Sequence, residues 1–212
     1  MRKISLPSKV FVTGTDTGIG KTFVSSVLSE KMKASYWKII QTGNDSDKEF
    51  VKSTTTLSED KIIDEAYKLK YPLSPYLASL KENKEININY ILKKLDQIKD
   101  HKIICEGAGG VMVPVQRKYF ISDLIKDIGF SAVIAARSGL GTINHTLLTI
   151  EHLKSKNIDI ACIILNGEIN EDNEKTIEDI SEIPVFSFGY LDFSKKINIF
   201  EMFEEKFSFE IR

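Results

Sequence analysis

A glycine-rich loop near the start of the sequence has the residues that can hold the phosphates of a nucleotide. It occupies residues 10–22, VFVTGTDTGIGKT, between a short apolar run and a helical pattern. Small residues let backbone N–H groups turn toward phosphate oxygens, and the positive end of the following helix favours the anion. Lys21 would reach the terminal phosphates, and the Thr22 hydroxyl would bind Mg²⁺. We therefore expect a phosphate loop that leads into a helix.

The loop departs from the usual spacing at one position. The pattern GxxxxGK[ST] requires a glycine where Thr15 stands, and the nearest glycine, Gly14, lies one residue too early. The segment is therefore either a lengthened phosphate loop or a glycine-rich turn at the start of an ordinary helix. The apolar run before it and the amphipathic pattern after it favour the phosphate loop, because the motif requires that context.

A second candidate site residue follows an apolar run in the middle of the chain. The run KIICE, residues 102–106, predicts a buried strand that ends in Glu106. A carboxylate in that position is costly unless it is paired or metal-bound, and in nucleotide-binding folds an acid after such a strand binds or orients Mg²⁺. The small residues that follow, Gly107, Ala108 and Gly109, would let the backbone approach a ligand closely, so we expect them to contact the nucleotide.

A lysine inside a third predicted strand is the next candidate. The run YWKII predicts a strand over residues 36–40, with Lys38 at its centre. Either Lys38 lies at an edge with its charge in water, or it is a cation aimed at a site beside the phosphate loop. Asp45 and Asp47 follow this strand; they are either solvated loop residues or metal ligands. The spacing alone leaves both questions open.

The elements that would position these residues alternate along the chain. This alternation predicts an α/β fold with a doubly wound, mainly parallel sheet flanked by helices, of the P-loop NTPase type, in one domain over residues 1–212. Ligands in such sheets bind at the carboxyl ends of the strands, where all the candidates fall. The predicted strands cover residues 10–12, 36–40, 102–106, 131–136, 158–165 and 184–188. The predicted helices cover residues 23–33, 88–98, 145–156, 171–182 and the chain from Phe193 onward, and residues 44–100 are more polar and mostly helical in pattern.

Composition narrows the classes of partner. The 29 Lys and Arg residues nearly balance 30 Asp and Glu, for a net charge of −1, so nothing indicates a nucleic-acid or acidic-membrane partner. No apolar run is long enough to span a bilayer. Cys105 and Cys162 lie in apolar runs, which predicts buried thiols in a reducing compartment, and we expect a cytoplasmic protein. His101, His145 and His152 lack metal-ligand spacing and are interpreted as structural or surface residues.

Four segments in the same order carry a family resemblance. With GTDTGIGKT, KIIQTG, EGAGGVMVP and GLGTINHTLLT, the sequence resembles the dethiobiotin synthetases from about residue 10 to about residue 190. The resemblance implies a homodimeric P-loop enzyme of biotin synthesis. Such an enzyme converts 7,8-diaminononanoate, CO₂ from bicarbonate and MgATP into dethiobiotin, ADP and phosphate.

The resemblance also implies a role for each matching residue. Lys38 would contact the carbamate and the transferred phosphoryl group and, with Lys21, act in catalysis. The Mg²⁺ ligands would be Thr22, Glu106 and Asp47, with Asp45 as the alternative to Asp47. The ATP phosphates would be bound by Gly18, Ile19, Gly20, Lys21, Thr22 and Phe23, and the rest of the nucleotide by Asn166, at the adenine, and Gly167. Thr17 and Thr42 would bind the diamine, and the residues that reach the neighbouring subunit's pocket would be Leu140, Gly141, Thr142, Ile143 and Asn144.

Two other classes of protein share parts of this pattern. A nucleotide-dependent switch or partitioning ATPase, like ParA or MinD, carries a lysine early in its loop, as in KGGxGK[ST], but Thr15, Asp16 and Thr17 stand there. A small-molecule kinase would have an arginine-rich lid segment, and none is visible. Both remain alternatives to the synthetase.

Overall fold

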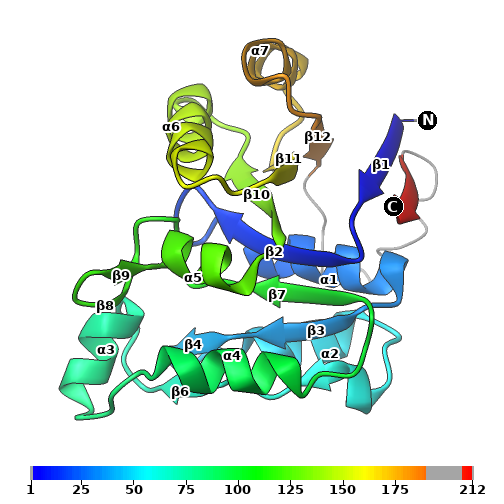
Figure 1. Cartoon of the computed structure of the whole chain (residues 1–212). Helices are drawn as coiled ribbons and strands as arrows, with labels where there is room; N and C mark the ends of the chain where they lie inside the picture. Colours follow the sequence, from blue (N-terminus) through cyan, green and yellow to red (C-terminus); the bar gives the residue numbers. More distant parts are fainter. Residues whose placement is uncertain (1, 190–206, 212) are drawn as a thin grey trace.

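A seven-stranded parallel sheet forms the centre of the computed structural model, which describes residues 2–189 and 207–211 (Figure 1). Its strand order is β12-β11-β10-β2-β7-β3-β5, and every neighbouring pair is parallel. The strands are β2 (Lys9–Gly14), β3 (Ser35–Lys38), β5 (Ile62–Ile63), β7 (Ile103–Glu106), β10 (Ser131–Arg137), β11 (Ile160–Asn166) and β12 (Val185–Phe188). The predicted α/β fold is confirmed.

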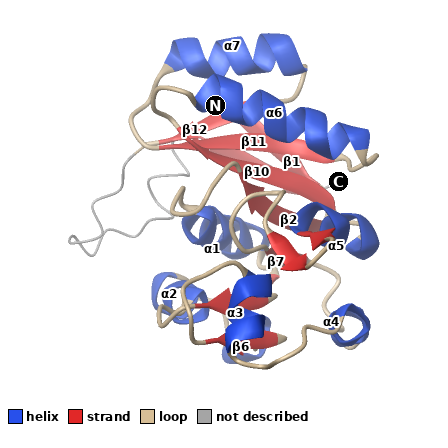
Figure 2. Cartoon of the chain, turned by 90° about the vertical axis from the view of Figure 1, so that its left-hand side faces the viewer, coloured by secondary structure: helices blue, strands red, loops and turns tan. Residues whose placement is uncertain are grey.

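Helices cover both faces of this sheet (Figure 2). Side chains alternate between the faces along a strand, so Val10 and Val12 pack with α1 (Lys21–Met32), whereas Phe11 faces the other layer. The helix α2 (Asp47–Thr54) lies beside α1. The opposite layer is formed by α4 (Ile88–Asp96), α5 (Ile121–Ile128), α6 (Thr142–Ser155) and α7 (Glu171–Ser181). The sheet is therefore wound on both sides, as the alternation of elements predicts.

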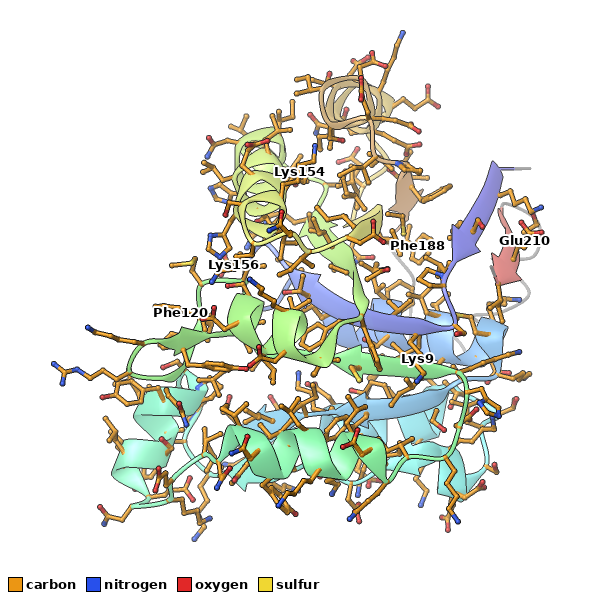
Figure 3. The ribbon with its side chains drawn as sticks, in the orientation of Figure 1. Lys9, Phe120, Lys154, Lys156, Phe188 and Glu210 are labelled. Carbon is orange, nitrogen blue, oxygen red and sulfur yellow. The ribbon has the colours of Figure 1, made fainter. Side chains whose placement is uncertain are left out.

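Three pairs of strands lie outside the central sheet. The strands β4 (Ile40–Thr42) and β6 (Tyr67–Leu69) pair in parallel, and β8 (Pro114–Gln116) and β9 (Tyr119–Phe120) form a hairpin near α3 (Pro75–Lys81). At the ends of the chain, β1 (Arg2–Leu6) pairs in parallel with β13 (Phe207–Ile211). Lys3 and Glu210 bridge this last pair over 2.7 Å (Figure 3). A 3-10 turn, η1 (Glu59–Lys61), completes the set of elements.

Some local predictions are wrong. The helix predicted from Phe193 onward is contradicted by β13, where the alternation in FSFEI suits a strand that pairs with β1; residues 193–206 lie outside the described part. The strand predicted over residues 36–40 divides, because β3 ends at Lys38 and β4 begins a separate sheet at Ile40. The region 44–100 also contains β5 and β6, which its mostly helical pattern did not predict.

The two cysteines agree with the sequence-based expectation of buried thiols. Cys105 and Cys162 are free and buried. Within residues 2–189 and 207–211, no helix is both long enough and apolar enough to cross a membrane.

Candidate active site

Three neighbouring strands of the sheet bring the candidate residues together. β2 lies beside β7, and β7 lies beside β3, with all three pointing the same way. Lys38 is the register partner of Glu106 on the adjacent strand. The phosphate loop follows the end of β2, so it lies at the same edge of the sheet. Parallel pairing thus joins segments that are far apart in the sequence.

The phosphate loop takes a shape that glycine permits. Gly18 and Gly20 have φ angles of 69° and 89°, in the region that other residues rarely adopt. A Cβ on Gly20 would lie 2.7 Å from the side-chain nitrogen of Asn166, so the loop also needs glycine there for space. Asn166 donates a hydrogen bond from Nδ2 to the Ile19 carbonyl over 2.9 Å. α1 begins at Lys21, directly after this turn.

Lys21 is a buried cation whose charge is incompletely balanced. Its Nζ donates to the Asp16 carbonyl over 2.8 Å. Burial and the nearby charge of Lys38 lower the pKa of Lys21 to about 8. An anion bound in the loop would reverse this, because opposite charge favours the protonated amine.

Lys38 is surrounded by acceptors. Its Nζ lies 2.8 Å from Glu106 Oε1, 2.6 Å from Asp47 Oδ2 and 3.0 Å from the Gly107 carbonyl. Burial lowers the pKa of Lys38, but Glu106 and Asp47 outweigh it and raise that pKa above the ordinary lysine value. Lys38 is 5% exposed, so its charge does not reach into water. The structure therefore supports the second interpretation of this lysine, a cation aimed at the site.

Glu106 is fully buried and bound through both carboxylate oxygens. Oε1 accepts hydrogen bonds from Thr22 Oγ1 over 3.0 Å and from Lys38. Oε2 accepts one from the Tyr36 hydroxyl over 2.9 Å. A buried carboxylate is stable only with such partners, and each of these partners also lies at the end of the sheet where the phosphate loop begins.

Of the two candidate acids, Asp47 contacts Lys38, whereas Asp45 is exposed. The Ser46 side chain caps α2 and accepts from Glu49 N, so the helix starts at Asp47. Gln41 Oε1 also accepts from the Asp47 amide over 3.3 Å. Burial raises the pKa of Asp47, but Lys38 outweighs it and lowers that pKa below the ordinary value. The geometry favours Asp47 over Asp45.

The oxygens of Thr22, Glu106 and Asp47 suit Mg²⁺ chemically. Mg²⁺ prefers oxygen ligands and is usually held by one or two carboxylates together with substrate phosphates and water. In the described part of the chain, no group of three or more His, Cys, Asp or Glu side chains could hold a metal by itself. Two carboxylates and a hydroxyl beside a phosphate loop match a metal that arrives with a nucleotide.

A cavity of about 830 Å³ opens above these residues. On one side lie the phosphate loop and the start of α1, and on the other lie Phe50 and residues 72–75, which precede and begin α3. The predicted site residues that line it are Thr17, Gly18, Gly20, Lys21, Thr22, Phe23, Lys38, Thr42, Asp47, its alternative Asp45, Glu106, Ala108 and Gly109. The cavity is large enough for reactants beyond the phosphates.

Comparisons with known proteins place this arrangement in a family. A protein-family model with the description AAA domain matches residues 8–198 of the chain. The ATP-dependent dethiobiotin synthetase BioD of Methanocaldococcus jannaschii is 38% identical over 215 residues, covering 95% of this chain and 96% of that one. The BioD protein of Lawsonia intracellularis is 44% identical over 165 residues, covering 77% and 78%. The chain belongs to the dethiobiotin synthetase family.

Solved structures of other proteins share the fold of this synthetase-family chain. A ParA family ATPase from Chlorobium tepidum has a TM-score of 0.55 with 12% identity, covering 94% of this chain and 93% of that one. At that identity the likeness concerns the fold alone. The switch-ATPase alternative therefore rests on a fold relative, whereas the synthetases match in sequence along most of the chain.

Several predicted residues lie away from the cavity of this synthetase-family chain. Leu140 is fully exposed in the loop between β10 and α6, and the segment 140–144 does not line the cavity. Asn166 and Gly167 lie at the end of β11, behind the phosphate loop. Ile19 is buried in the core beneath the loop. A Cβ on Gly107 would lie 2.8 Å from the Phe11 ring, so this glycine serves packing.

Sequence reasoning missed Tyr36 as a site residue. An aromatic residue in a buried strand is typical of a core, and nothing in its type indicates a contact with Glu106. A usable signal was its spacing, because Tyr36 stands two positions before Lys38, and residues two apart in a strand share a face. Phe50 and residues 72–75 were also missed, since their place at the cavity depends on packing between distant segments.

Proposed function

We propose that this chain is an ATP-dependent dethiobiotin synthetase, which closes the ureido ring of dethiobiotin from 7,8-diaminononanoate, CO₂ and ATP. One observation carries the proposal beyond family membership. Two buried ammonium groups, Lys21 and Lys38, converge on a single cavity beside an oxygen ligand set. Such a pair suits a reaction in which two anions must approach each other.

The nucleotide would lie along the phosphate loop. Backbone N–H groups of residues 18–23 and the Lys21 ammonium would hold its phosphates. The Asn166 Oδ1 atom supports a place for the base, because it is buried and has no hydrogen-bond partner among the described residues; the amino group of adenine would supply one. Thr22, Asp47 and Glu106 would hold Mg²⁺, which neutralises phosphate charge when bound.

The diamine would occupy the side of the cavity that faces α3. Thr42 and, from the phosphate loop, Thr17 offer hydroxyl groups to it, and residues 72–75 offer a mostly apolar wall. All three Lys38 donors are engaged by Glu106, Asp47 and Gly107. When the two carboxylates turn to the metal, they would free Lys38 for the reactants.

The reaction then needs three steps. One amine forms a bond to the carbon of CO₂ and loses a proton, which gives a carbamate. A carbamate oxygen attacks the γ-phosphorus of ATP, the bond to ADP breaks, and a mixed carbamic-phosphoric anhydride results. The second amine attacks the carbonyl carbon, expels phosphate and closes the ring.

The chain contributes position and charge to these steps. Lys38 would hold the carbamate against the γ-phosphate, and Lys21 would bind the phosphate oxygens, so repulsion between the two anions falls. No enzyme nucleophile takes part in the scheme. Burial raises the pKa of Cys105 far above its ordinary value, so that residue stays a thiol.

A homodimer would give the segment 140–144 its role. Leu140 is fully exposed and Leu148, on the same helix-loop unit, is 62% exposed. Exposed apolar side chains of this size are available for contact with a second subunit. Within a dimer, residues 140–144 would reach the diamine pocket of the neighbouring subunit.

Phosphate release tests the proposed function. The assay compares the complete mixture of ATP, Mg²⁺, diaminononanoate and bicarbonate with each single omission. Strict dependence on both diaminononanoate and bicarbonate is the expected result. Release that instead needs a partner protein or DNA would indicate a switch ATPase, and a stable phosphorylated small molecule would indicate a kinase; either outcome contradicts the proposal.

A further inference from the structure

We infer that Tyr36 is a positioning residue, whose hydroxyl orients the Glu106 carboxylate toward the metal and the phosphates. The inference rests on the proposed function, since it assigns a role within the same site. Tyr36 has no exposed surface and lies on the same face of β3 as Lys38. It therefore forms part of the floor of the site without reaching the cavity.

The contacts of Glu106 divide between its two oxygens. Oε1 faces Thr22 and Lys38, both of which line the cavity. Oε2 faces Tyr36, at 2.9 Å. Because the phenol bonds Oε2, it fixes the orientation of the carboxylate and leaves Oε1 directed at Thr22, in the first turn of α1.

The contact between Tyr36 and Glu106 follows from the register of their two strands. In the pairing of β3 with β7, Tyr36 stands opposite Ile104 and Lys38 opposite Glu106. Tyr36 thus lies two residues closer than Lys38 to the amino end of β3, and its hydroxyl points toward the carboxyl end, where it contacts Glu106. Both groups are fully buried, so neither has water as a substitute partner, and losing the bond would leave a buried acceptor unsatisfied.

The contact gains importance when reactants bind. Lys38 also holds Glu106 in the structure, but the proposed mechanism releases Lys38 to the carbamate. Tyr36 takes no part in that exchange because it does not line the cavity. It then remains the donor that fixes Glu106 from the protein side, in the manner of an outer partner of a metal ligand.

Tyr36→Phe tests the inference, because it removes the hydroxyl and keeps the ring. Calorimetric binding of ATP is measured with Mg²⁺ and again with EDTA. The expected result is a loss on the order of tenfold in affinity with Mg²⁺, the range for outer partners of metal ligands, and no change in EDTA. The Mg²⁺ concentration for half-maximal turnover should rise by a similar factor.

Trp37→Phe is the matched control. Trp37 is the next residue on β3, is equally buried and donates from Nε1 to the Asp64 carbonyl over 3.0 Å. Its side chain points to the opposite face, so its loss should lower thermal stability without altering the Mg²⁺ dependence. If Trp37→Phe shifts the Mg²⁺ dependence as much as Tyr36→Phe does, the specific role of Tyr36 is wrong.

A double-mutant cycle with Glu106→Gln locates the effect. If Tyr36 acts through Glu106, Tyr36→Phe should have no further effect on Mg²⁺-dependent binding in the Glu106→Gln background.

A folded Tyr36→Phe protein with wild-type Mg²⁺ dependence would overturn the inference. Should Tyr36→Phe fail to fold, Tyr36→Met replaces it, since it also lacks the donor. Wild-type protein that binds MgATP but does not use diaminononanoate would instead contradict the proposed function, so the two failures can be told apart.

Discussion

A lysine–carboxylate pair lies near each end of the strands β3 and β7, and the two pairs differ in their surroundings. At the carboxyl end, Lys38 and Glu106 are buried and line the cavity. At the amino end, Lys61 lies 2.9 Å from Asp100, with side chains 30% and 25% exposed. This pair lines a second cavity of about 610 Å³, to which the phosphate loop contributes no residue. The chemistry of the two pairs is alike, so their positions in the fold must decide what each one does.

The amino-end pair joins segments of the chain. Asp100 accepts hydrogen bonds from the Ser35 hydroxyl, from Lys61 and from the Lys102 amide. Lys61 also donates to the Lys33 carbonyl over 2.6 Å. These groups tie the start of β3 to the loop before β7, so we expect this end to contribute stability alone.

Another charged residue, Lys9, lies at the amino end of the sheet, away from the candidate site. Lys9, at the start of β2 (Figure 3), has its Nζ 5.7 Å from the centre of the Phe130 ring. The contrast teaches that an ion pair in this fold indicates chemistry where it is buried beside the phosphate loop, and not merely where it lines a cavity. The following predictions test that distinction.

The largest effect is expected at Lys38. Lys38→Ala should reduce turnover by on the order of 10²-fold or more, because it removes a preorganised charge from the reacting anions. Initial rates of dethiobiotin formation measure this. Lys61→Ala is the matched control, which makes the same change near the other end of β3 and should leave turnover near the wild-type rate. Equal losses in the two variants would remove the distinction between the two ends.

Glu106 should control the metal dependence. Glu106→Gln keeps the size of the side chain but removes its charge, so the Mg²⁺ requirement for turnover should rise ten- to hundredfold, on the order seen when metal coordination is weakened. A Mg²⁺ titration of phosphate release measures the shift. An unchanged titration curve would rule out Glu106 as a ligand.

The segment 140–144 should act across the dimer. Asn144→Ala is expected to lower kcat/KM for the diamine on the order of tenfold, by loss of a polar contact to substrate, with ATP binding unchanged. The matched control is Asn89→Ala, an exposed asparagine on α4, outside this loop.

Mixed dimers test whether the site is shared. If one site takes Lys38 from one subunit and Asn144 from the other, refolding Lys38→Ala with Asn144→Ala protein gives mixed dimers with one intact site. An equal mixture should then recover about a quarter of wild-type activity. Activity that stays at the average of the two variants would contradict a shared site.

The smallest effect is expected at the amino end. Although burial raises the pKa of Asp100, hydrogen bonds from the Lys102 amide, Lys61 and Ser35 lower it to about 2. The contribution of the carboxylate to stability is therefore present above about pH 4 and is lost as pH falls toward 2. Asp100→Asn should lower stability by about 1 kcal/mol at neutral pH.

Thermal unfolding across pH measures this difference. The gap between wild type and Asp100→Asn should be constant from about pH 5 to 7 and close as the carboxylate titrates below about pH 4. Turnover should be unchanged. A loss of turnover comparable to that of Lys38→Ala would show that the amino end also serves the reaction.

Sequence reasoning succeeded where a strand forms an uninterrupted apolar run. The runs in β2, β7, β10 and β11 carry enough apolar residues to predict a buried parallel sheet from local pattern alone. The pairing of β1 with β13 could not be predicted in this way, since it joins the two ends of the chain. The helix predicted from Phe193 onward is wrong over the FSFEI segment, because these residues form β13 and pair with β1.

The candidate site was predictable in part. Lys21, Thr22, Lys38, Asp47 and Glu106 come together as expected, because the ends of adjacent parallel strands must meet; their roles stay predictions. Tyr36 was missed because its hydroxyl acts from within the core. The role proposed for the segment 140–144 needs a second subunit, so it comes from the family resemblance and not from the packing of one chain.

A crystal structure with Mg²⁺, a non-hydrolysable ATP analogue, diaminononanoate and bicarbonate tests the central claim most directly. The account predicts that Glu106 and Asp47 face the metal, and that Lys38 Nζ lies within hydrogen-bond distance of both the carbamate and the γ-phosphate. A structure in which Lys38 still bridges Glu106 and Asp47, with the reactants bound elsewhere, would contradict it.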